Sequence, residues 1–184
     1  MKIAIAALAL LAATAHAEEY NAILADKSSV AFVYRQMNVP IEGRFGKFAA
    51  QLKFDPARPA AASATIDIDL ASIDTGTAEG DDEVAGKLWF NTKAHPTARF
   101  AATSFRALGG NRYEAVGKLT IKGRTQDMTA PFAFAQQGRN GIAEGALTIK
   151  RADFAIGEGI WADFGTVANE VQIKFRLQAE ANKK

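Results

Sequence analysis

Residues 170–178 alternate polar and apolar side chains without interruption. A period of two is typical of a β-strand, because successive side chains point to opposite faces. Shorter alternating segments recur along the chain, and each has one apolar and one polar face, as antiparallel sheets allow. They span 30–34, 48–54, 65–70, 99–105, 113–123, 131–135 and 145–151. The pattern therefore predicts a mainly all-β protein of eight antiparallel strands, arranged as a sandwich or a barrel.

One segment breaks the alternation and predicts a single short helix. Residues 77–88 are acidic at their start, and Val84 and Leu88 are spaced i, i+4. Thr77 or Asp81 is the expected N-cap. Because the sequence shows no repeat, linker or low-complexity tract, residues 18–184 are expected to form one domain.

The N-terminus has the pattern of an export signal. Lys2 supplies a positive charge, residues 3–13 are apolar, and residues 15–17 read Ala-His-Ala. The apolar run is shorter than the ~20 residues that a membrane-spanning helix needs. We therefore expect residues 1–17 to be a cleaved signal peptide and the protein to be periplasmic. The absence of cysteine gives no disulfide to support the domain, which at this length can rely on its core.

The residue types restrict the chemistry. His16 falls in the expected signal peptide, so His95 is the remaining imidazole, and it precedes Pro96 without a nucleophile motif nearby. Metal sites built on His and Cys are excluded by this composition. Asp67 and Asp69 lie on the polar face of a predicted strand, so this pair of carboxylates is no evidence of acid–base catalysis. The formal net charge is +2 with scattered basic residues, which does not favour nucleic acid. The sequence predicts a protein that is not an enzyme and binds no metal or nucleic acid.

Six ordered motifs carry a family resemblance. They are Glu-Gly-Arg-Phe at 42–45, Ser-Ile-Asp-Thr at 72–75, Lys-Leu-Trp-Phe at 87–90, His-Pro-Thr-Ala-Arg-Phe at 95–100, Gly-Lys-Leu-Thr-Ile-Lys-Gly at 117–123 and Arg-Ala-Asp-Phe-Ala-Ile-Gly at 151–157. In this order they resemble the YceI-like family of lipocalin-type, polyisoprenoid-binding periplasmic proteins. The resemblance implies an eight-stranded antiparallel lipocalin-like barrel with one short helix. It also implies a bound apolar lipid, such as a polyisoprenoid or a prenylated quinone, and no covalent cofactor.

Strand parity and the resemblance together predict a set of ligand-binding residues. Strand parity, meaning which alternate residues share one face of a strand, indicates only which side chains are buried. A packed core therefore remains the alternative to a cavity. Small residues beside aromatic ones favour a cavity, and the two tryptophans of the set are placed either at its mouth or in an aromatic plug. The predicted set is Phe32, Tyr34, Phe48, Phe54, Ile66, Ile68, Trp89, Phe100, Ala115, Gly117, Leu119, Ile121, Phe132, Phe134, Ile149, Trp161 and Phe175.

Arg151 shares the inward parity and has two possible roles. It is predicted to bind a lipid headgroup, or to form a structural ion pair with Asp153 or Asp163. Two other functions stay open at this point. The protein is alternatively an interaction protein that docks a membrane partner through the Trp161 loop, or a hydrolase or isomerase on an amphiphile that uses His95 or the two aspartates. The expected partners are an apolar lipid and, transiently, a membrane or membrane protein, with the chain a monomer or homodimer.

Overall fold

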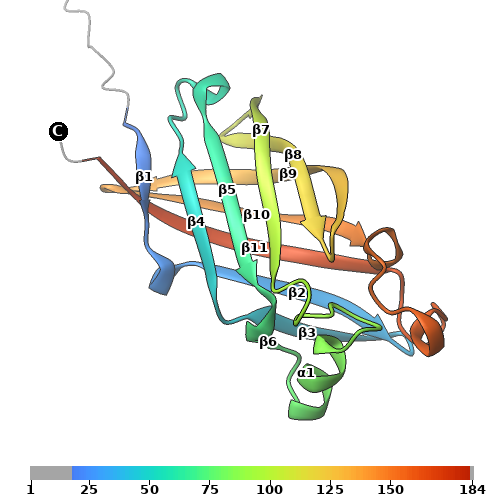
Figure 1. Cartoon of the computed structure of the whole chain (residues 1–184). Helices are drawn as coiled ribbons and strands as arrows, with labels where there is room; N and C mark the ends of the chain where they lie inside the picture. The colour runs from blue at the N-terminus through green and yellow to red at the C-terminus, as the bar shows by residue number, and fades with distance from the viewer. Residues whose placement is uncertain (1–17, 183–184) are drawn as a thin grey trace, which may run out of the picture.

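One antiparallel sheet curls around an apolar interior in the computed structural model, which describes residues 18–182 (Figure 1). The strand order is β4-β5-β7-β8-β9-β10-β11-β2-β3-β6, and β1 pairs with β11. The predominance of strands and the single α-helix in this part of the chain confirm the predicted class. The predicted signal peptide lies outside the described residues.

Residues 18–182 contain eleven strands where eight were predicted. The three additional strands are β1, β3 and β6. β1 and β6 are too short to show a period, while Pro40 and Gly43 disfavour a strand at β3. The strands are β1 Tyr20–Ile23, β2 Ser29–Gln36, β3 Val39–Phe45, β4 Phe48–Lys53, β5 Ser63–Asp69, β6 Ile73–Asp74, β7 Thr97–Gly109, β8 Arg112–Ile121, β9 Arg124–Gln137, β10 Asn140–Lys150 and β11 Glu170–Ala181.

Two short strands bring the ends of the sheet together. The backbone N–H of Tyr20 in β1 donates to the carbonyl of Phe54 at 2.9 Å, and the N–H of Phe54 donates back at 3.1 Å. This joins β1, which pairs with β11, to the chain that leaves β4. At the opposite end Ile73 of β6 pairs with Phe45 of β3. The sheet therefore wraps around its interior as a barrel.

The α-helix α1 spans Ala78–Ala85 and lies at one end of the barrel (Figure 1). The Thr77 side chain is its N-cap, with the oxygen accepting from the N–H of Gly80 at 3.1 Å. Asp81, the other candidate, instead accepts from the backbone N–H and the hydroxyl of Thr75. The helix ends three residues before the predicted Leu88, since Gly86 takes an extended conformation.

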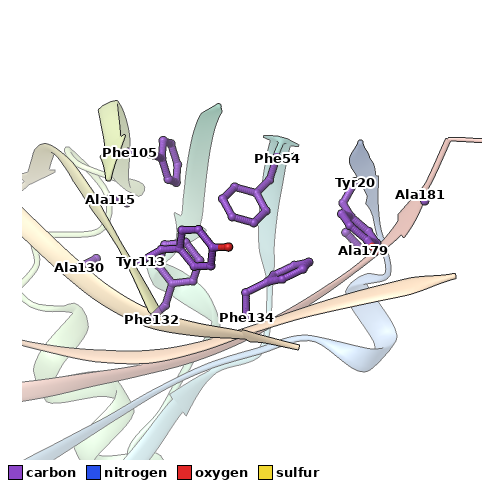
Figure 2. Close-up of a cluster of buried hydrophobic side chains, with 10 residues drawn as sticks. All are labelled: Tyr20, Phe54, Phe105, Tyr113, Ala115, Ala130, Phe132, Phe134, Ala179 and Ala181. Atoms are coloured by element: carbon purple, nitrogen blue, oxygen red, sulfur yellow. The ribbon is translucent and has the colours of Figure 1, made fainter. Parts of the chain in front are cut away.

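The interior divides into two hydrophobic clusters. The first, here called the aromatic cluster, fills the end of the barrel opposite α1 and is shown in Figure 2. Its centre is Phe54, whose ring centroid lies 5.2 Å from that of Tyr113 and 5.0 Å from that of Phe134. The second cluster surrounds Trp89 and Phe154 near α1. Close aromatic packing thus closes one end of the barrel.

Candidate functional site

A cavity of about 510 Å³ occupies the barrel. This volume lies within the range of small-molecule sites, roughly 300–1,000 Å³. Nearly all of the lining side chains are apolar, and the charged ones are Glu79, Glu83 and Arg151. Of the lining residues only Glu79 and Glu83 of α1 are exposed. The cavity therefore opens beside α1 and is closed at its other end by the aromatic cluster.

Most of the predicted ligand-binding residues line this cavity. Alternate residues of a strand share a face, so parity selected side chains that the curled sheet turns inward. Their contact with a ligand remains a prediction. The members that line the cavity are Phe32, Tyr34, Phe54, Ile66, Ile68, Trp89, Phe100, Ala115, Leu119, Ile121, Phe132, Phe134, Ile149, Trp161 and Phe175.

Phe48 and Gly117 lie outside the lining. Phe48 pairs with Ile68 at the start of β4, directly after the bend at Gly46. Gly117 was expected to add cavity volume, and this expectation is wrong. A Cβ at Gly117 would lie 2.8 Å from the Cα of Ala102 and closer still to the carbonyl oxygen of Ala101. The glycine permits the close approach of β7 and β8 beside an irregularity in their register.

Further lining residues were not predicted. Leu147 and Ile173 share the parity of the predicted Ile149 and Phe175, so the alternation contains the signal that identifies them. Glu79 and Glu83 reach the cavity through the position of α1. The position of α1 at the cavity depends on tertiary packing, so no local sequence pattern predicts it.

Arg151 is 1% exposed and holds together the segment that follows β10. Nε donates to the carbonyl of Ala168, Nη1 to those of Ile156 and Gly157, and Nη2 to those of Trp161 and Val167, at 2.7 to 3.1 Å. All five guanidinium N–H groups are thereby used. Burial lowers the pKa of Arg151, and the charge of Asp163 partly opposes this effect.

Neither predicted role of Arg151 agrees with this geometry. Asp153 and Asp163 make no ion pair with it within residues 18–182. With each donor already bonded to a backbone carbonyl, the guanidinium has no N–H free for a headgroup. The partners are carbonyls of residues 156–168, and their convergence on one side chain was not visible in the sequence. Arg151 is a structural residue of the rim.

The rim of the cavity joins α1 to residues 155–168. The Trp161 Nε1–H donates to Glu83 Oε1 at 2.7 Å. The rings of Trp161 and Trp89 lie 5.5 Å apart, with Trp89 buried and Trp161 partly exposed. The carbonyl of Leu88 accepts from the N–H groups of Gly157 and Glu158, both at 2.8 Å. Trp161 therefore lies at the mouth, whereas the aromatic plug is the cluster at the opposite end.

The residues considered for catalysis lie elsewhere. His95, Asp153 and Asp163 are outside the cavity lining. Asp163 shapes its own turn, where Oδ1 accepts from the Gly165 N–H and Oδ2 from the Thr166 hydroxyl. These hydrogen bonds, that of Gly165 foremost, lower the pKa of Asp163. Within residues 18–182, no group of His, Asp or Glu is arranged to hold a metal ion, and no helix has the length and apolar character to cross a membrane.

The curled antiparallel sheet, its capping helix and its apolar interior define a lipocalin-like β protein. The chain belongs to the YceI-like family, because the YceI-like domain matches residues 22–179. It is 32% identical over 143 residues to a UPF0312 protein of Pseudomonas aeruginosa, which covers 74% of this chain and 72% of that protein.

Two solved structures extend the comparison. BcnA of Burkholderia cenocepacia is 49% identical, with a TM-score of 0.84 over 85% of this chain and 99% of that one. A polyisoprenoid binding domain from Saccharophagus degradans is 17% identical, with a TM-score of 0.69 over 90% of this chain and 100% of the other. The second similarity shows a common fold.

Proposed function

We propose that this protein is a periplasmic carrier that holds one long apolar lipid, such as a polyisoprenoid or a prenylated quinone, inside the barrel. The observation that carries the proposal is the apolar cavity of about 510 Å³ with one open end. Apolar cavities of roughly 150 Å³ already bind benzene. A cavity more than three times larger, left between the two hydrophobic clusters, supports a hydrocarbon ligand rather than a solely structural interior.

The polarity of the cavity suits a ligand with a long apolar part and a small polar end. The apolar part would lie between the aromatic cluster and the rim. The polar end would lie near the opening, where Gln36, Thr75, Glu79 and Glu83 supply the polar lining. The Saccharophagus degradans domain of the same fold is named for polyisoprenoid binding, which agrees with this ligand class.

The arrangement favours binding over catalysis. A hydrolase or isomerase needs an acid, base or nucleophile in contact with its substrate. His95, Asp153 and Asp163, the residues considered for that role, lie outside the lining. The export pattern of residues 1–17 supports a periplasmic location, and fractionation of cells that express the full chain would test it.

The ligand is testable by extraction. Protein purified without detergent is extracted with organic solvent, and the extract is analysed by mass spectrometry against an equal amount of an unrelated periplasmic protein. We expect one apolar lipid in a stoichiometric amount. Repeated preparations without lipid, together with failure to take up added prenyl lipid, would contradict the proposal.

A further inference from the structure

The open end of the barrel carries a cluster of exposed apolar side chains, here called the rim patch. It consists of Met37, Val39, Leu88, Ile160 and Phe164. Ile160 is 81% exposed and Met37 is 74% exposed. Single exposed apolar side chains are common on protein surfaces, but exposed apolar groups that gather in one place mark interaction sites.

The members of the rim patch adjoin the cavity mouth. Met37 follows the lining residue Gln36, and its N–H donates to the Thr166 carbonyl at 2.9 Å. Ile160 precedes the lining residue Trp161. The ring of Phe164 lies 5.2 Å from the guanidinium carbon of Arg151, which also lines the cavity.

The remaining exposed large apolar residue of residues 18–182 is Leu108, at the opposite end of the barrel. It lies in the β7–β8 hairpin, between Phe105 and Tyr113 of the aromatic cluster. Exposed apolar side chains are therefore concentrated at the end where the cavity opens. This asymmetry connects the patch with the passage of a ligand.

We infer that the rim patch inserts into the surface of a lipid bilayer, so that an apolar ligand passes directly between the bilayer and the cavity. The inference rests on the proposed function. On a route through water, each methylene exposed on the way lowers the equilibrium population of the water-exposed intermediate about fourfold. A long lipid therefore exchanges far more readily when the cavity mouth is in contact with the bilayer.

The shape and charge of the rim favour a bilayer over a folded protein partner. The patch is divided among three places: the β2–β3 turn with the first residue of β3, Leu88 three residues beyond the end of α1, and the 159–164 segment. A fluid bilayer accommodates separate protrusions, whereas a protein interface needs a continuous complementary surface. Glu79, Glu83 and Lys87 give the rim charges of both signs. Apolar insertion, rather than attraction to anionic lipid, is the expected driving force.

The test is flotation with vesicles of phosphatidylcholine alone. It uses residues 18–184, which contain every described strand, because the apolar run at 3–13 would itself bind vesicles. We expect wild-type protein to float with the vesicles at both low and high salt. The Met37→Ser/Ile160→Ser variant should bind at least tenfold more weakly, the loss expected for two large apolar side chains.

Leu108→Ser is the matched control, because Leu108 and Phe164 are both 49% exposed. Phe164→Ser should weaken flotation and Leu108→Ser should not. Equal losses in the two variants, or no flotation of wild-type protein, would overturn the inference. Binding only to native membranes, and only before protease treatment of those membranes, would also overturn it by indicating a protein partner.

The lipid content of each variant separates this inference from the proposed function. Variants of the rim patch should retain their copurified lipid while losing vesicle binding. If wild-type protein carries lipid but fails to float, the inference of bilayer insertion is wrong and the carrier function stands. If wild-type protein neither carries nor takes up lipid, the proposed function is wrong, and the inference that rests on it is overturned with it.

Discussion

Replacing Arg151 by methionine is expected to destabilise the rim and much of the fold. The substitution keeps a long side chain but removes five hydrogen bonds to backbone carbonyls. Three of these bonds, to Ile156, Gly157 and Val167, are fully buried. A hydrogen bond to a charged group contributes ~1.5 kcal/mol, so losing the three buried bonds should lower the free energy of unfolding by about 4–5 kcal/mol. Water reaching the freed carbonyls is the main effect that would reduce it.

The assay is urea unfolding monitored by tryptophan fluorescence, because Trp161 lies in the segment that Arg151 holds and Trp89 packs against Trp161. Arg44→Met is the control, because Arg44 makes an exposed ion pair with Asp74 and its loss should cost at most about 1 kcal/mol. Arg151→Lys separates charge from donor number and should lie between wild type and Arg151→Met. If Arg151→Met unfolds at the same urea concentration as Arg44→Met, the structural role assigned to Arg151 is refuted.

Three further predictions concern single positions. Burial foremost, then the hydrogen bond to Glu18, raises the pKa of Tyr20 to about 12. The free energy of unfolding should therefore be unaffected by ionisation of this phenol below about pH 10 and fall by about 2–3 kcal/mol as the pH rises to about 12. Urea unfolding at each pH measures this loss, which should be absent from Tyr20→Phe. Trp161→Phe removes the hydrogen bond to Glu83, so release of a fluorescent lipid should accelerate about fivefold in stopped-flow measurements. Gly117→Ala should lower the free energy of unfolding by about 1–3 kcal/mol without reducing the lipid content.

Each of these predictions has a contradicting result. A wild-type pH dependence identical to that of Tyr20→Phe would remove the linkage assigned to the phenol. An unchanged release rate in Trp161→Phe would show that its bond to Glu83 does not restrain the mouth. Unaltered stability of Gly117→Ala would contradict the close backbone approach at that glycine.

Strand parity predicted which side chains face inward, because the direction of a side chain in a strand is a local property. The alternation of Ile66 and Ile68, or of Leu119 and Ile121, is sufficient to place them on the inner face. The resemblance to the YceI-like family then correctly indicated how the sheet curls. Parity does not determine the volume inside, which depends on strand number and on how the sheet closes through Tyr20.

The errors arose where the backbone, rather than a side-chain pattern, decides the structure. Gly117 resembled cavity space in the sequence, but it is required by the approach of β7 and β8. Arg151 resembled a ligand-binding or ion-pairing residue, but its partners are carbonyls brought together by the path of residues 156–168. Every residue type has a backbone carbonyl, so no sequence motif indicates these hydrogen-bond partners.

The central claim is that the lipid occupies the cavity inside the barrel. Ala64 and Ala143 line the cavity and are half-buried. Since a cavity of roughly 150 Å³ holds a benzene ring, Ala64→Phe/Ala143→Phe would fill more than half of the 510 Å³. The control, Ala49→Phe/Ala133→Phe, adds the same rings at exposed positions on β4 and β9.

The decisive measurement is the amount of lipid per folded protein in these two variants, determined by native mass spectrometry. The account predicts that the cavity-filled variant is folded and almost free of lipid, while the control carries as much as wild type. Full lipid content in a folded Ala64→Phe/Ala143→Phe protein would contradict the claim that the cavity is the binding site.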